Sequence, residues 1–92
     1  MNQHVRVIVT GRVQGVGYRA WTVREAHARG LSGWVRNRCD GTVEAVFSGD
    51  IEAVDAMAAA CWKGPALARV AHIATSPCSD AIAPGFSAQP TV

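Results

Sequence analysis

The residues with the clearest chemical potential form a glycine-rich segment near the amino terminus, Gly11-Arg12-Val13-Gln14-Gly15-Val16-Gly17-Tyr18-Arg19. Glycines at 15 and 17 allow backbone conformations in which successive N–H groups point into one concavity. A helix that starts directly after them adds positive potential, so the loop can hold an oxyanion. Arg19, in the first turn of that helix, carries a permanently charged, forked donor suited to bidentate contacts with a phosphate.

This segment is also compatible with a structural role and with other nucleotide-binding patterns. Two glycines also make an ordinary tight connection, and Arg19 could be one more solvated arginine. The spacing Gly15-x-Gly17-x-x-Ala20, with Asp40 about twenty residues further on, matches a dinucleotide-binding fingerprint. That site needs further parallel βαβ units, however, and Asp40 falls in a predicted turn. The GK[ST] ending of a nucleoside triphosphate loop is missing as well.

A second informative segment runs from Gly33 to Glu44 and contains Asn37 at a position that the pattern assigns to a strand. Asparagine is a poor strand residue, and a local misfit of this kind more often marks function than packing. Its amide both donates and accepts hydrogen bonds, so it can orient a water molecule. The alternative is that Asn37, close to a turn, only bonds to the backbone.

Hydrophobic alternation predicts the strands that must position these residues. Val5, Val7 and Val9 alternate with more polar neighbours, and this strand ends at Gly11. Runs over 34–39 and 42–47 meet at Asp40-Gly41, a strong hairpin signal, so they should pair antiparallel. A fourth strand is predicted over 67–75.

Two helices are predicted between these strands. Residues 18–29 contain no Gly or Pro and are followed by Gly30, with Tyr18, Thr22, Ala26 and Arg29 on one face. The second helix has Asp50 as its N-cap and an apolar stripe, and it ends at Gly64-Pro65. That stripe consists of Ile51, Val54, Ala58 and Cys61.

The predicted order β-α-β-β-α-β is the ferredoxin-like α+β sandwich, an antiparallel sheet with two helices on one face. The 92 residues are expected to form a single domain, 1–92, with one core. After about residue 78 the chain carries Pro84-Gly85 and Pro90 around a lone Phe86. This tail should be a short edge strand or loosely ordered.

Composition narrows the class of protein. The hydrophobic fraction of 49% and charged fraction of 17% suit a soluble globular fold, and no run approaches a membrane span. The amino terminus lacks a secretory signal pattern, so a cytoplasmic location is expected. Cys39, Cys61 and Cys78, like the three histidines, are too scattered for metal-ligand spacing, and free thiols are expected.

Charge is distributed unevenly along the chain. Residues 1–40 hold seven arginines and two acids, a net +5, whereas the remainder holds two basic and five acidic residues, a net −3. A basic half suggests an anionic ligand, but arginines spread over strands, a loop and a helix are mostly solvated surface. Only a specific constellation of residues turns this asymmetry into an argument for a site.

Together the two segments resemble the signatures of the acylphosphatase family. The loop follows G-x-V-Q-G-V-x-[FY]-R, and Gly33 to Glu44 follows G-W-V-x-N-x-x-D-G-x-V-E. The resemblance continues through the second predicted helix to Gly64-Pro65-Ala66 and covers about residues 4 to 75. Departures lie elsewhere: Arg29 stands where the family often has Leu, and the segment around Phe86 is less strand-like than the family's last strand.

The resemblance implies hydrolysis of the carboxyl-phosphate bond of an acyl phosphate, by in-line attack of water, to a carboxylate and inorganic phosphate. It implies that Arg19 and Asn37 are catalytic, with Asn37 positioning the water. The phosphate would be held by the amides of Gly15, Val16, Gly17, Tyr18 and Arg19 together with the Arg19 side chain. A carboxylate leaves without protonation, so no metal, cofactor or acid is expected. The expected protein is a monomer that binds neither nucleic acid nor membrane.

Two alternatives from another class of function share the same fold. One is a catalytically weak phosphate-binding module, which the presence of both Arg19 and Asn37 argues against. The other is an RNA-binding module, because the RNA-recognition domain has this strand order. Such a module needs exposed aromatic residues on the central strands, and the first and third predicted strands offer only Phe47.

Overall fold

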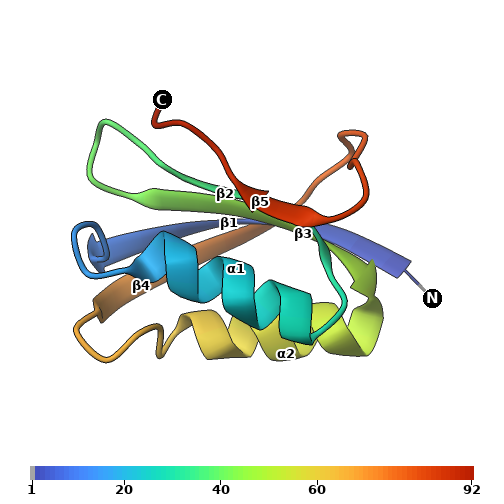
Figure 1. The fold of residues 1–92 in the computed structure, drawn as a ribbon, viewed down its shortest axis with the longest axis horizontal. Coiled ribbons are helices and arrows are strands. Elements are labelled where there is room, and N and C mark those ends of the chain that lie inside the picture. Colours follow the sequence, from blue (N-terminus) through green and yellow to red (C-terminus); the bar gives the residue numbers. More distant parts are fainter. Residues whose placement is uncertain (1) are drawn as a thin grey trace.

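The computed structural model describes residues 2–92 and arranges them as one sheet with two helices packed against it (Figure 1). In chain order the elements are β1 (Asn2–Arg12), α1 (Tyr18–Ala28), β2 (Ser32–Asn37), β3 (Val43–Asp50), α2 (Ile51–Cys61), β4 (Arg69–Pro77) and β5 (Phe86–Ala88). The predicted ferredoxin-like βαββαβ order is therefore confirmed. Its strands and helices match the predicted runs to within a few residues at each end.

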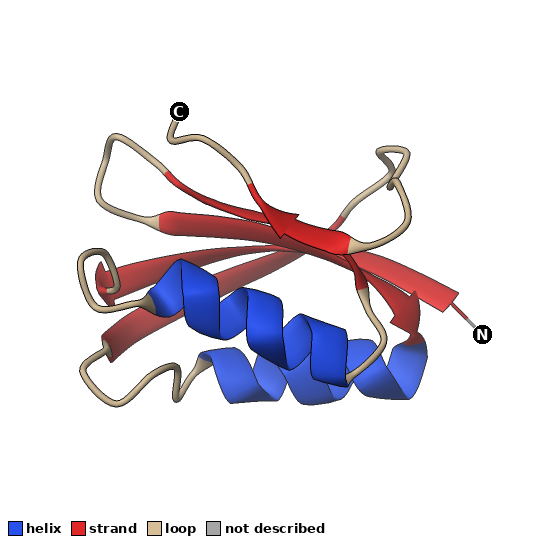
Figure 2. Ribbon diagram, in the orientation of Figure 1, coloured by secondary structure: helices blue, strands red, loops and turns tan. Residues whose placement is uncertain are grey.

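The strand order in the sheet is β4-β1-β3-β2-β5, and both helices cover the same face (Figure 2). Pairs β1–β3, β1–β4 and β2–β3 are antiparallel, as predicted. The added strand β5 pairs parallel with β2, so the sheet is mixed and the prediction of an antiparallel sheet was wrong at this edge. The reason is directional: β4 ends at the end of the sheet where β2 begins, so a chain that crosses 78–85 must run back alongside β2.

The core lies between the sheet and the helices. Val5, Val7 and Val9 of β1 are buried there, which confirms the predicted alternation. Helix α1 buries Tyr18, Thr22 and Ala26, as expected from the sequence, whereas Arg29, predicted on the same face, is the C-cap residue and is half-buried. The hydroxyl of Thr22 donates to the Tyr18 carbonyl 2.8 Å away, so this polar side chain is satisfied inside the core.

Helix α2 begins where it was predicted to begin. The Asp50 carboxylate accepts a hydrogen bond from the Glu52 N–H at 3.2 Å, as an N-cap should. Its buried stripe is Val54, Met57 and Cys61, whereas Ile51, predicted to belong to it, is exposed. The helix is rotated so that the buried face is centred on Val54, Met57 and Cys61, which leaves Ile51 at its border in contact with solvent and Ala58, also predicted for the stripe, half-buried. Neither helix within residues 2–92 has the length and apolar character needed to cross a bilayer.

The connection between β2 and β3 is longer than a two-residue turn. It spans residues 38–42, and the Arg38 N–H donates to the Thr42 carbonyl at 2.9 Å. Asp40 organises it, because its Oδ1 accepts from both the backbone N–H of Thr42 (3.0 Å) and the Thr42 hydroxyl (2.6 Å). Gly41 has a φ of 90°, which suits the glycine predicted to turn the chain here.

The Tyr18 side chain connects the beginning of α1 to the end of α2. It is buried, and its hydroxyl donates to the Cys61 carbonyl at 2.6 Å. The ring also packs beside Gly64, where an added Cβ would lie 2.7 Å from a ring carbon. The hydrogen bond satisfies one of the carbonyls that a helix end leaves without a partner, and it fixes where α1 starts relative to α2.

The buried side chains of Tyr18 and Cys61 predict that the protein loses stability at alkaline pH. Burial raises the pKa of the Cys61 thiol from 9.0 to about 11. Burial, and then the neighbouring Cys61, raise the pKa of the Tyr18 phenol above its ordinary 10.0. The folded chain therefore keeps protons that the unfolded chain releases. The contribution of these two groups to the free energy of unfolding is fully present below pH 9, and it is lost as the pH rises toward their pKa values in the folded state.

We expect the free energy of unfolding, measured by denaturant titration, to be level from pH 7 to 8.5. Between pH 9.5 and 11 it should fall by on the order of 1 kcal/mol per pH unit. Tyr18→Phe removes the phenol and should flatten this slope, although it lowers stability at pH 7. An unfolding free energy that stayed constant up to pH 11 would contradict the assignment.

Candidate active site

A cavity of about 320 Å³ lies where the loop before α1 meets the end of β2. We call it the loop cavity. Its walls come from the loop and first turn of α1, from β2 and from β5, and consist of Val13, Gln14, Gly15, Gly17, Tyr18, Arg19, Ala20, Asn37 and Ala88. Five of the six residues singled out from the sequence line this one space. Arg19 and Asn37, which belong to different elements, are brought together by the fold.

The backbone of the loop has the conformation that the glycines were expected to allow. Gly15 has φ 74° and Gly17 has φ 82°, both in the left-handed region. Gly17 is the N-cap of α1 and has no side chain to bond the first amides of the helix. Within residues 2–92, none of the backbone N–H groups of residues 15–19 donates to an acceptor. The loop and helix start thus present adjacent free donors beside the cavity.

Val16 differs from its neighbours in this loop. Its side chain is half-buried and packs against the hydrophobic core, and the residue is not part of the cavity wall. Any contribution it makes to a ligand would come from its backbone N–H alone. The packing of Val16 also holds the middle of the loop against the protein between the two left-handed glycines.

Arg19 is half-buried, and it is the arginine that lines the loop cavity. It makes no ion pair or side-chain hydrogen bond with any residue of the described chain. Most of the other arginines in the basic first forty residues have acidic neighbours. These pairs are Arg6–Glu44 at 3.3 Å, Arg29–Glu25 at 2.7 Å, Arg36–Glu44 at 2.8 Å and Arg38–Asp40 at 3.9 Å. Their charges are largely neutralised, whereas the charge of Arg19 faces the loop cavity.

Asn37 is the last residue of β2 and lies opposite Val43 of β3. Its side-chain amide forms no hydrogen bond with residues 2–92, although its backbone carbonyl accepts from the Val92 N–H at 3.2 Å. The turn-stabilising role that an asparagine here could have taken is performed by Asp40. The Asn37 amide is therefore available to a molecule in the loop cavity.

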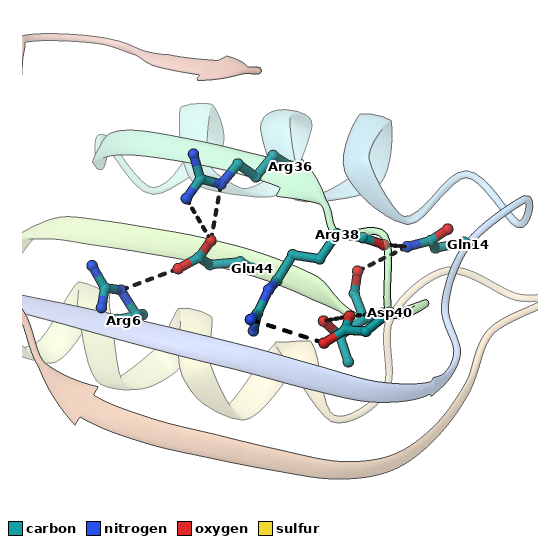
Figure 3. A network of polar contacts seen from close by, with 7 residues as sticks. Arg6, Gln14, Arg36, Arg38, Asp40 and Glu44 are labelled. Atoms are coloured by element: carbon teal, nitrogen blue, oxygen red, sulfur yellow. Dashed lines mark hydrogen bonds and ion pairs between the residues drawn. The ribbon is translucent and has the colours of Figure 1, made fainter. Parts of the chain in front are cut away.

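Four residues of the cavity wall were not among the predicted site residues: Val13, Gln14, Ala20 and Ala88. Gln14 lies within the loop motif, and its side-chain amide donates to the carbonyls of Arg38 (2.8 Å) and Thr42 (2.9 Å), as Figure 3 shows. Its place next to Gly15 was the one signal that the sequence offered. Ala88 comes from β5, and nothing in the sequence indicated that β5 would pair with β2 beside Asn37.

Two other arginines of the sheet, Arg6 and Arg36, gather around Glu44 (Figure 3). Glu44, 7% exposed, receives Arg36 through Nε at 2.9 Å and through Nη2 at 2.8 Å. The Nε of Arg6 is buried 3.3 Å from the other carboxylate oxygen, close enough for an ion pair but without hydrogen-bond geometry. A cavity of about 530 Å³ beside them contains no residue predicted for the site. The network is a cross-strand structural contact between β1, β3 and β2.

Comparison with known proteins identifies the same family that the two sequence segments resemble. The model of the acylphosphatase family matches residues 5–88. An acylphosphatase of Rhodospirillum rubrum is 52% identical, with 94% of each chain covered. One of Nitrobacter winogradskyi is also 52% identical, over the full length of both chains.

Solved structures agree with these matches. The crystal structure of an acylphosphatase from Bacillus subtilis superposes with a TM-score of 0.89 at 37% sequence identity, covering 97% of this chain and 99% of the other. An acylphosphatase from Coxiella burnetii gives a TM-score of 0.91 at 28% identity, covering 96% and 93%. Family model, full-length relatives and fold therefore coincide, and the chain belongs to the acylphosphatase family.

Proposed function

We propose that this acylphosphatase binds the phosphoryl group of its acyl phosphate in the loop cavity, between the amides of residues 15–19 and the Arg19 guanidinium. The observation that carries the proposal is the convergence of unpaired donors: free amides and an arginine without an acidic partner border one space. A phosphoryl group has three oxygens that need such donors, and the helix start contributes further positive potential. Binding there would leave few of these donors unsatisfied.

Asn37 is proposed to orient the attacking water. It approaches the loop cavity from β2, whereas the phosphate donors approach from the loop and α1. Its side-chain amide carries both an acceptor oxygen and donor N–H groups, so it can hold a water molecule in one orientation. A water held this way is placed relative to phosphorus, and positioning of this kind lowers the barrier without an acidic or basic side chain.

The proton balance of the reaction is simple. Water oxygen bonds to phosphorus while the bond from phosphorus to the acyl oxygen breaks, and the acyl group departs as a carboxylate. Both water protons finish on the phosphate, which leaves as dihydrogen phosphate. No Asp, Glu or His lines the loop cavity. We therefore propose the substrate's own phosphoryl oxygens as the base, with charge stabilised by Arg19.

Three free cysteines fit a reducing compartment, so we propose a cytoplasmic location, and we propose a monomer.

An RNA-binding role is disfavoured by the placement of Phe47. That side chain is fully buried and stacked on Phe86 at 5.5 Å, in the core on the helix side of the sheet. It is not available to stack on a base.

We predict that Arg19→Ala lowers hydrolysis of a small aromatic acyl phosphate by about 100-fold or more and weakens inhibition by inorganic phosphate. The reason is loss of the one guanidinium that faces the phosphoryl group. Arg19→Lys should restore little, because an ammonium cannot reproduce a two-pronged contact. Arg24→Ala, on the exposed side of α1, is the matched control and should keep normal activity. Normal turnover in a correctly folded Arg19→Ala would disprove the phosphate role.

A second prediction separates binding from chemistry. Asn37→Ala should reduce kcat by about 100-fold or more while the inhibition constant of phosphate changes little, because Asn37 acts on the water in the transition state. Its melting temperature should stay close to wild type, since the side chain bonds to no other residue of 2–92. Parallel loss of phosphate binding, activity and stability would instead identify Asn37 as a structural residue.

We predict further that activity survives exhaustive chelation and treatment with a thiol-alkylating reagent. No group of three or more His, Cys, Asp or Glu side chains suited to a metal gathers within residues 2–92. None of the cysteines lines the loop cavity, and Cys61 is buried with a raised pKa, so it should react slowly. Loss of activity with chelator, restored by zinc or magnesium, would overturn this prediction.

A further inference from the structure

The Gln14 side chain connects the phosphate-binding loop to the hairpin that carries Asn37. Its Nε2 donates to the Arg38 carbonyl at 2.8 Å and to the Thr42 carbonyl at 2.9 Å (Figure 3). A primary amide nitrogen has two N–H donors, and both are used. The reversed amide orientation would place the side-chain oxygen against two carbonyl oxygens, so the chemistry fixes which end faces the hairpin.

The two acceptors lie at the two ends of the connection 38–42, which joins β2 to β3. The Thr42 carbonyl also accepts from the Arg38 N–H at 2.9 Å, and the Arg38 carbonyl also accepts from the Gly41 N–H at 3.0 Å. Gln14 therefore bonds to both ends of this connection at once. Arg38, at the first end, is the residue directly after Asn37. Across the described chain, these are the hydrogen bonds that join residues 13–17 to residues 37–43.

The other side of Asn37 is held by the tail. The Val92 N–H donates to the Asn37 carbonyl at 3.2 Å, and the Cys39 N–H donates to the Val92 carbonyl at 2.6 Å. These are backbone contacts, which fix the strand end relative to the sheet edge. Neither contact reaches the loop, so within residues 2–92 the hydrogen bonds between the loop and this strand end come from Gln14.

Packing of Val13, Val16 and Tyr18 anchors the loop to the core, and within residues 2–92 the hydrogen bonds of Gln14 are what tie it to the hairpin. Gly15, directly after Gln14, has a left-handed φ, and the amides of residues 15–19 form no hydrogen bonds within 2–92. A displacement of about 1 Å between two reacting groups can cost about 100-fold in rate. A loop free to move relative to Asn37 would lose the alignment between phosphorus and water.

We infer that Gln14 is a positioning residue for the hydrolysis: it sets the distance between the phosphoryl group and the water held by Asn37. This inference rests on the proposed role of Asn37. Gln14 does not act on the reacting atoms in this scheme, and its effect passes through the hairpin backbone. Removing it leaves no carbonyl without a donor, because Arg38 and Gly41 still bond to the same two oxygens. The variant should therefore fold.

The test uses Gln14→Leu, which keeps the bulk and removes both donors, with Gln14→Met as a second variant. Gln3→Leu is the matched control, since Gln3 on β1 has no side-chain bond within the described chain. We expect kcat for a small aromatic acyl phosphate to fall at least about tenfold in both Gln14 variants. The inhibition constant of phosphate should change less than about threefold, and the Gln3 variant should match wild type.

The deciding measurement is a double-mutant cycle with Asn37→Ala. If Gln14 acts through Asn37, adding Gln14→Leu to Asn37→Ala should change kcat less than about twofold. A full tenfold loss in that background, or wild-type kcat in both Gln14 single variants, would overturn the inference. So would equal losses of activity and phosphate binding.

The same cycle distinguishes this inference from the proposal beneath it. If Asn37→Ala lost activity while the Gln14 variants kept it, the Gln14 inference alone would fail. If Asn37→Ala kept wild-type kcat, the water-positioning role would fail, and the Gln14 inference with it.

Discussion

The backbone N–H groups of residues 15–19 have no acceptor within residues 2–92, and much of the surrounding structure serves to keep them in that state. Unpaired amides in a flexible segment would turn toward water or toward neighbouring carbonyls. Here both ends of the loop are fixed. Val13 is buried in the core before it, and Tyr18 is buried after it with its hydroxyl bonded to the Cys61 carbonyl. The glycines between these anchors keep the left-handed conformation that frees the donors.

Ion pairs elsewhere in the molecule favour binding of the phosphoryl group at the loop cavity. A phosphoryl dianion is attracted by every unpaired cation near it, so specificity for one place depends on neutralising the others. Glu44 is buried between Arg6 and Arg36, and Glu25 pairs with Arg29 four residues along α1. Buried ion pairs contribute little net stability once desolvation is counted. Their effect here is to leave Arg19 as the unpaired guanidinium at the loop cavity.

The sequence predicted the residues with local signals and missed those that depend on long-range placement. Gly15 and Gly17 lie in a loop, Arg19 lies in the first turn of the helix that follows, and Asn37 interrupts a strand pattern, so each could be singled out. Met57 replaced Ile51 in the buried stripe of α2 because helix rotation against the sheet, not periodicity, decides which face is covered. The parallel pairing of β5, and with it Ala88, depended on where the chain crosses the sheet, for which no local pattern exists.

The position of β1 between β4 and β3 also affects how the chain reaches its fold. Val5 pairs with Phe47 on one side and with Pro77 on the other, so the first strand made is the one whose partners lie furthest along the sequence. Closing such loops costs entropy before any strand contact compensates for it. Folding on a timescale of about milliseconds to seconds follows from this topology. An emerging chain exposes the valines of β1 throughout synthesis of the remainder, and the charge of Arg6 within that strand protects it from association.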